Sequence, residues 1–194
     1  STGSGMEAPT GYDGFGGFLN WNGNFGDDEN LAVTVWEHRD NDVPRTDRLV
    51  TGFGQTNPSD DVYLFEKQDR KRAQLTYTND DFDWDMADAM QIRLYAQTYD
   101  EDRQRMLFGS STTRFESDET QTLGLGIDWT KKLSSDHLLT YGFDVSYDEV
   151  DSTRTDVSGG TPTVKDGQFA PNSQYTSFGA FVQDEIFSFD PIDI

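Results

Sequence analysis

The chain has 194 residues, with 15 Lys and Arg against 36 Asp and Glu, and therefore a formal net charge of −21. This balance excludes a nucleic-acid-binding protein, because contacts to a phosphate backbone need clustered Lys and Arg. The lack of cysteine excludes disulfides, thiolate metal sites and cysteine nucleophiles. No run of about 18 apolar residues is present, so the sequence predicts no transmembrane helix.

Hydrophobic residues make up only 34% of the chain, which together with a high net charge is typical of disorder. The 14 Phe, 8 Tyr and 4 Trp residues argue against disorder. We therefore expect a folded chain that is polar on average but carries large apolar side chains at particular positions.

Strict alternation of apolar and polar residues recurs along the chain, and helical periodicity is nearly absent. In the clearest segment, 122–130, Leu123 and Leu125 share one face while Gly124 and Gly126 share the other. The pattern predicts seven strands, at 15–22, 31–36, 73–78, 91–97, 122–130, 138–147 and 177–183. The polar faces fit either bulk water or the wet interior of a barrel, and the pattern alone does not separate the two.

The connections between these strands are predicted to alternate in length. Short turns are expected at 23–30, 80–89 and 131–136, and long loops at 43–69, 100–120 and 148–174. Short turns on one side and long loops on the other are typical of outer-membrane β-barrels. Trp and Tyr near the strand ends fit the aromatic belts of such barrels, although the same residues could also fill the core of a soluble β-sandwich.

Three stretches resemble one known family. They are 42–48 (DVPRTDR), 137–144 (HLLTYGFD, continuing to Ser152) and 177–185 (SFGAFVQDE). In this order they resemble the barrel of TonB-dependent outer-membrane receptors of the haem and siderophore type, over about residues 12–194.

The resemblance implies a 22-stranded barrel around an N-terminal plug, in the outer membrane of a Gram-negative-type bacterium. It implies uptake of an iron complex, a siderophore or haem, or of another scarce nutrient, powered by the TonB complex through the plug. The sequence departs from that pattern because it has about seven strands, no plug and no TonB box. We therefore interpret 1–194 as an internal segment of the barrel, all-β and antiparallel, with lipid as a further partner.

Two other readings stay open. One is a small, complete outer-membrane barrel of eight strands with a structural or adhesive role, in which 55–66 supplies the eighth strand and the chain end pairs with the first. The other is a soluble carbohydrate-binding β-sandwich whose aromatic residues stack on sugars.

Candidate ligand-binding residues are His38, Arg45 and Arg48, which fall where the second strand enters a long loop. A histidine can ligate haem iron, and the two arginines can hold an anionic iron chelate. The competing interpretation is structural, with His38 a solvated strand-end residue and the arginines paired with Asp42 and Asp47.

The sequence predicts no catalytic residues, no metal site and no cofactor, and so no enzyme. A string of aspartates at 81, 83 and 85 is similar to the start of a calcium loop. It lacks the glycine and the glutamate that such a loop needs, because Met86 and Ile92 occupy those positions, so we interpret it as an acidic turn. His137 is placed beside a short turn and is not expected to be a ligand.

Overall fold

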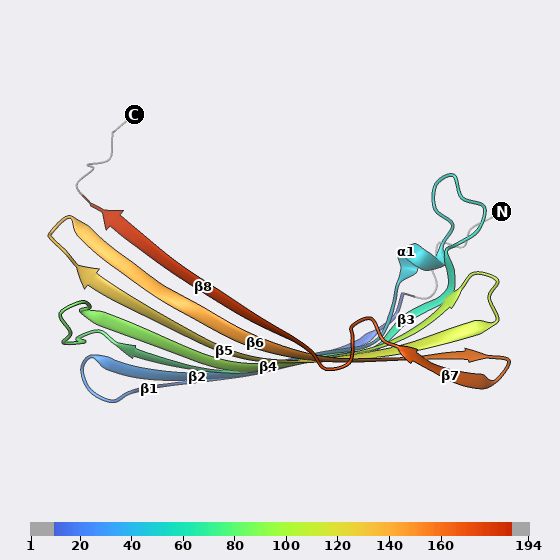
Figure 1. Cartoon of the computed structure of the whole chain (residues 1–194), viewed down its shortest axis with the longest axis horizontal. Coiled ribbons are helices and arrows are strands. Elements are labelled where there is room, and N and C mark those ends of the chain that lie inside the picture. Colours follow the sequence, from blue (N-terminus) through green and yellow to red (C-terminus); the bar gives the residue numbers. More distant parts are fainter. Residues whose placement is uncertain (1–9, 188–194) are drawn as a thin grey trace.

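The computed structural model describes residues 10–187, and it consists of one large antiparallel sheet with a single short helix (Figure 1). In chain order the elements are β1 (Asp13–Asn24), β2 (Glu29–Pro44), α1 (Thr46–Leu49), β3 (Asp60–Asn79), β4 (Ala89–Leu107), β5 (Thr112–Lys132), β6 (His137–Ser158), β7 (Thr161–Asp166) and β8 (Ser173–Ile186). Within this range no helix is long and apolar enough to cross a membrane.

The strands follow one another across the sheet as an antiparallel meander from β1 to β6. β6 then pairs with two later strands along different parts of its length, with β7 over 153–158 and with β8 over 137–150. Among the described residues β1 pairs only with β2, and β8 pairs only with β6, so the sheet is open and not closed. Figure 1 shows it as a long twisted surface whose two ends turn up in the same direction.

The seven predicted strands are confirmed, and all of them are longer than expected. β5, for example, runs over 112–132 rather than 122–130. The sequence reading missed β7, which lies inside the segment 148–174.

The predicted long loops are wrong in extent, because opposite charges and hydroxyl groups paired across the strands let the ladders continue. Only 45–59, 108–111, 159–160 and 167–172 connect strands at that end of the sheet. The strict alternation of lengths also fails, since the connection at 80–88 is longer than the one at 108–111.

The register of the pairs places the apolar residues of seven strands on one face. Leu125, for example, lies opposite Leu94 on one side and Val145 on the other. We call this set the apolar belt: Leu19, Trp21, Leu31, Val33, Val35, Ala73, Leu75, Tyr77, Met90, Ile92, Leu94, Ala96, Leu123, Leu125, Ile127, Trp129, Leu139, Tyr141, Phe143, Val145, Tyr147, Phe178, Ala180 and Val182.

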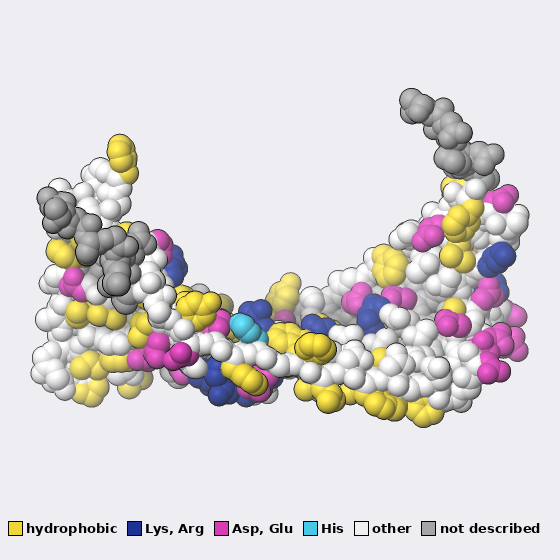
Figure 2. Space-filling model, turned by 180° about the vertical axis from the view of Figure 1, so that it is seen from behind, with side chains coloured by type: hydrophobic (Ala, Val, Ile, Leu, Met, Phe, Trp, Pro, Cys, Tyr) yellow, Lys and Arg dark blue, Asp and Glu magenta, His cyan; other side chains and the backbone are white. Residues whose placement is uncertain are grey.

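No second layer of described residues covers the belt. Ala87 is the one hydrophobic residue in 10–187 that is buried, while Phe178 and Val182 are more than 70% exposed. In Figure 2 yellow apolar side chains project along the lower border of the sheet, in the half of the view that carries the short turns. The belt therefore needs a covering that the described chain does not supply.

Aromatic side chains gather where the belt meets the short turns. Trp129 stacks on Tyr141 with 5.6 Å between ring centroids, and Trp84 from the 80–88 turn lies 6.3 Å from Trp129. The Tyr141 hydroxyl donates a hydrogen bond to the carbonyl of Met86 over 2.8 Å, which ties this turn to β6. A rim of Trp and Tyr beside an apolar band is typical of a membrane–water interface.

Candidate functional site

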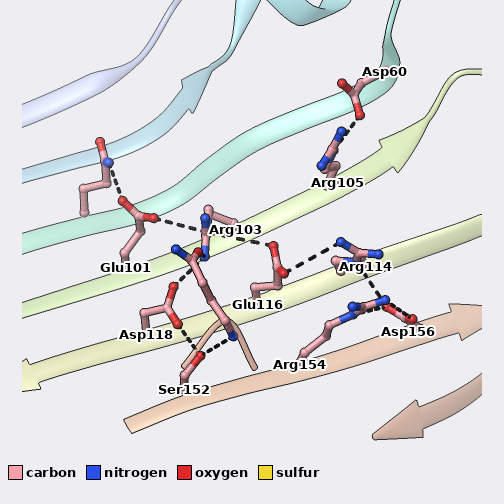
Figure 3. A network of polar contacts seen from close by, with 12 residues as sticks. Asp60, Glu101, Arg103, Arg105, Arg114, Glu116, Asp118, Ser152, Arg154 and Asp156 are labelled. Carbon is pink, nitrogen blue, oxygen red and sulfur yellow. Dashed lines mark hydrogen bonds and ion pairs between the residues drawn. The ribbon is translucent and has the colours of Figure 1, made fainter. Parts of the chain in front are cut away.

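The opposite side of the sheet, which we call the polar face, carries polar and charged side chains such as Arg93, Asp128 and Asp144. Beyond the belt, towards α1 and β7, β3 to β6 carry an ion-pair network (Figure 3). It consists of two groups of ion pairs. One joins Arg48 of α1 and Arg105 to Asp60, and the other joins Arg103, Arg114 and Arg154 to Glu101, Glu116, Asp118 and Asp156. The network is balanced in charge, so the net charge of −21 arises elsewhere in the chain.

Arg103 lies at the centre of this network, with a side chain only 12% exposed. Its guanidinium nitrogens lie 3.2 Å from Glu101, 4.0 Å from Glu116 and 2.5 Å from Asp118. β4 supplies Arg103 and Glu101, and β5 supplies the other two, because Arg103 pairs with Glu116 in the register of the sheet. Cross-strand pairs of opposite charge stabilise neighbouring strands, so this cluster fastens β4 to β5.

Asp60, the first residue of β3, has a fully buried side chain. Nε of Arg48 donates to one carboxylate oxygen over 3.0 Å, and Nε of Arg105 donates to the other over 2.6 Å. Asp60 therefore joins α1, β3 and β4. Removing either arginine would leave a buried carboxylate only half compensated.

Asp156 on β6 is the third centre of the network. Arg154 binds it with two hydrogen bonds of 2.9 and 2.6 Å, and Nε of Arg114 lies 3.4 Å away. The hydrogen bonds from Arg154 are the main reason that the pKa of Asp156 lies below its ordinary value.

The connection 167–172 folds back onto this network. Ser152 Oγ donates to Asp118 over 2.5 Å and accepts the backbone N–H of Gln168 over 2.8 Å. The Gln168 side chain in turn accepts a hydrogen bond from Arg103 over 2.9 Å. Only a glycine fits at Gly167, because a Cβ there would lie 2.1 Å from the Ser152 hydroxyl.

Tyr99 lies next to the network on β4. Its hydroxyl donates to Glu101 over 2.5 Å, and Gln68 on β3 donates to the same carboxylate over 2.8 Å. Burial of the ring, followed by the hydrogen bond to Glu101, raises the pKa of Tyr99 to about 12. The phenol is therefore a neutral hydrogen-bond donor at physiological pH.

The three candidate residues from the sequence all lie at this end of the sheet, and each has its own acidic partner. His38 on β2 lies 3.0 Å from Asp40. Arg45 makes two hydrogen bonds of 2.9 Å to Asp47, and this pair raises the pKa of the guanidinium further above its ordinary value. The structural pairing considered for Arg45 with Asp47 is present.

Arg48 pairs with Asp60 across 12 residues rather than with Asp42 or Asp47. Its guanidinium thus holds α1 against β3. His137 lies at the other end of the sheet, where it contacts Asp184 at 2.8 Å.

Within residues 10–187 no three His, Asp or Glu side chains are arranged to hold a metal ion. The aspartates at 81, 83 and 85 lie in the turn between β3 and β4, as the acidic-turn interpretation expected.

Sequence reasoning missed the network because most of its residues fall in segments predicted as loops. A usable signal was present at 101–105 and 114–118, where charged residues recur at every second position, which is the period of a strand. The alternation of apolar residues from which the strands were predicted stops at the edge of the belt.

No protein-family model matches this chain, and no curated protein matches it.

Proposed function

We propose that this chain forms part of the wall of an outer-membrane β-barrel transporter of the TonB-dependent receptor type. The apolar belt faces lipid, and the polar face lines the lumen. The proposal is carried by one observation, which is that a continuous apolar belt crosses seven strands on a single face of an uncovered sheet.

The dimensions of the belt support this placement. Its residues span 123–129 on β5 and 139–147 on β6, and the stretch on β6 reaches the lower end of the roughly 9–11 residues that a tilted strand needs to cross a bilayer. Outer-membrane barrels have an apolar band about 25 Å tall, flanked by aromatic girdles. The cluster of Trp84, Trp129 and Tyr141 occupies the place of one girdle.

The open edges of the sheet favour a segment of a larger wall over the two other readings. A small closed barrel would need β8 to pair with β1 and would need a separate strand at 55–66, whereas β3 runs through that segment from Asp60. A soluble sandwich would need a second sheet over the belt, and residues 10–187 form a single sheet. Unpaired edges in a barrel wall are completed by neighbouring strands.

The transported ligand follows from the resemblance, which suggests a ferric siderophore, haem or another scarce nutrient. Binding and gated passage are the whole mechanism, with no chemical step. Energy comes from the TonB complex through a plug domain, and the network on the polar face keeps the wall rigid around the passage.

Site-directed spin labelling tests the orientation of the sheet. The chain has no cysteine, so single cysteines can be placed at Leu75 and Val145 on the belt and at their neighbours Gln74 and Ser146 on the polar face. In reconstituted vesicles we expect oxygen to relax the first two labels and a water-soluble nickel chelate to relax the second two. Equal accessibility of all four labels would contradict the barrel orientation.

The transport role needs a separate test in cells. We expect deletion of the gene to abolish TonB-dependent uptake of one labelled iron complex from a panel of ferric siderophores and haem. Unchanged uptake of every complex would reject an iron complex as the transported ligand. The spin labels test the orientation of the sheet independently of this result.

A further inference from the structure

Two arginines on the polar face differ from all the others in the described chain. Arg70 and Arg72 on β3 form no ion pair, whereas every other arginine in residues 10–187 has a carboxylate partner. In a chain with a net charge of −21, two adjacent uncompensated guanidiniums on one face are unexpected from composition. In Figure 2 the Lys and Arg side chains gather in the middle of the molecule.

Each of the two guanidiniums is held against a tyrosine ring. Arg72 lies over Tyr95 with 4.2 Å from the guanidinium carbon to the ring centroid, and Arg70 lies over Tyr99 at 4.8 Å. A side chain of Gln74 accepts a further hydrogen bond from Arg72 over 2.9 Å. Cation–π stacking occupies the flat side of a guanidinium and leaves its N–H edge free for another acceptor.

The tyrosines are themselves fixed in place. The Tyr95 ring packs over Gly124, and the Tyr99 hydroxyl is bound to Glu101. The stacked arginines are therefore preorganised, which lowers the entropy that a ligand must remove on binding.

Two side chains of β2 flank these arginines. In the register of the sheet, His38 lies opposite Arg70 and Trp36 lies opposite Arg72 on β2. Arg70 and Arg72 are two residues apart on β3, and the rings on which they stack, Tyr99 and Tyr95, are four residues apart on β4, so the two guanidiniums are separated by roughly 7 to 14 Å. Two carboxylates of one small molecule can span that distance.

We propose that Arg70 and Arg72 form a binding site for a small polycarboxylate ligand, with one carboxylate held by each guanidinium. The identification follows from charge complementarity, because the planar fork of an arginine matches a carboxylate in two parallel hydrogen bonds. This proposal depends on the proposed function in one respect, which is that the polar face lines a passage.

Binding of citrate tests the site, measured by isothermal titration calorimetry on the whole protein in detergent micelles, with inorganic phosphate as the single-oxyanion comparison. We expect citrate to bind more tightly than phosphate, and R70Q and R72Q each to weaken citrate binding several-fold. For the double variant we expect about a tenfold loss or more, since partly exposed ion pairs are individually weak.

Two controls separate the site from general effects of charge and folding. R154Q removes an arginine that is already paired with Asp156 and should leave citrate binding unchanged. R70K/R72K keeps both charges and should retain part of the affinity, which distinguishes loss of the site from loss of the fold.

The site is overturned if R70Q/R72Q binds citrate as tightly as the wild type, if R154Q weakens citrate binding equally, or if phosphate binds as tightly as citrate. These outcomes are independent of the spin-label test. Citrate binding in micelles does not require a lipid-facing belt, and the belt does not require these two arginines.

Discussion

The ring of Tyr95 lies directly over Gly124, its cross-strand neighbour on the polar face. A Cβ added at Gly124 would lie 2.2 Å from Cε1 and Cζ of that ring, which is far inside van der Waals contact. The close approach of the aromatic ring therefore requires a glycine at this position. The same ring also stacks against the guanidinium of Arg72 on β3. The pair links the packing of β4 and β5 to the position of an arginine on β3.

We expect Gly124→Ala to destabilise the protein by about 1–3 kcal/mol, because the added methyl group displaces the Tyr95 ring. The free energy of unfolding can be followed by tryptophan fluorescence during a urea titration in micelles. Gly179→Ala is the matched control, since Gly179 also lies in a strand on the polar face and a Cβ there meets nothing within 4 Å. Equal effects of the two substitutions would show that the ring does not need the glycine.

Asp60→Asn should destabilise the protein by about 3 kcal/mol, the low end for breaking a buried ion pair. The change leaves Arg48 and Arg105 without their shared carboxylate, but both arginines are partly exposed and recover some hydration. Asp47→Asn, which removes the exposed partner of Arg45, should change stability by less than about 1 kcal/mol. The same urea titration measures both variants. If Asp60→Asn leaves the free energy of unfolding unchanged, Asp60 does not hold α1, β3 and β4 together.

Asp156 should make the stability of the protein dependent on acid pH. Its pKa is lowered in the folded protein, chiefly by Arg154, so its contribution is fully present above the ordinary value of 3.8. The contribution is then lost as the pH falls through the folded pKa. We expect Asp156→Asn to be less stable than the wild type at neutral pH, with the difference shrinking below about pH 4. A difference that stays constant down to acid pH would contradict the assignment.

Tyr99 should ionise only at strongly alkaline pH. Its pKa of about 12 predicts a tyrosinate absorbance step at strongly alkaline pH that disappears in Tyr99→Phe. Because the folded pKa is raised above 10.0, the stabilisation is present below pH 10 and is lost as the pH rises towards 12. Glu101→Gln removes the hydrogen-bonded carboxylate and should move the step to lower pH. If the absorbance step does not move in Glu101→Gln, burial alone accounts for the raised pKa of Tyr99.

The sequence by itself determined the fold class and the two faces of the sheet. Alternation such as Leu123, Gly124 and Leu125 repeats at the period of a strand, and that period reports directly which side chains share a face. All seven predicted strands are present for this reason. The pairing of Arg45 with Asp47 was also foreseeable, since the two residues are close in the chain.

Only the tertiary structure decided how far the strands run and which charges meet. Asp60 meets Arg105 across 45 residues, and Arg103 meets Gln168 across 65, so neither pair has a local signal in the sequence. The segment 100–105, which carries Arg103 and Arg105, is polar on both faces, and polarity without apolar alternation is typical of a loop. Cross-strand ion pairs and hydrogen bonds take the place of apolar contacts there, and the register of the sheet alone sets which residues form them. The same register leaves Arg70 and Arg72 facing tyrosines instead of carboxylates.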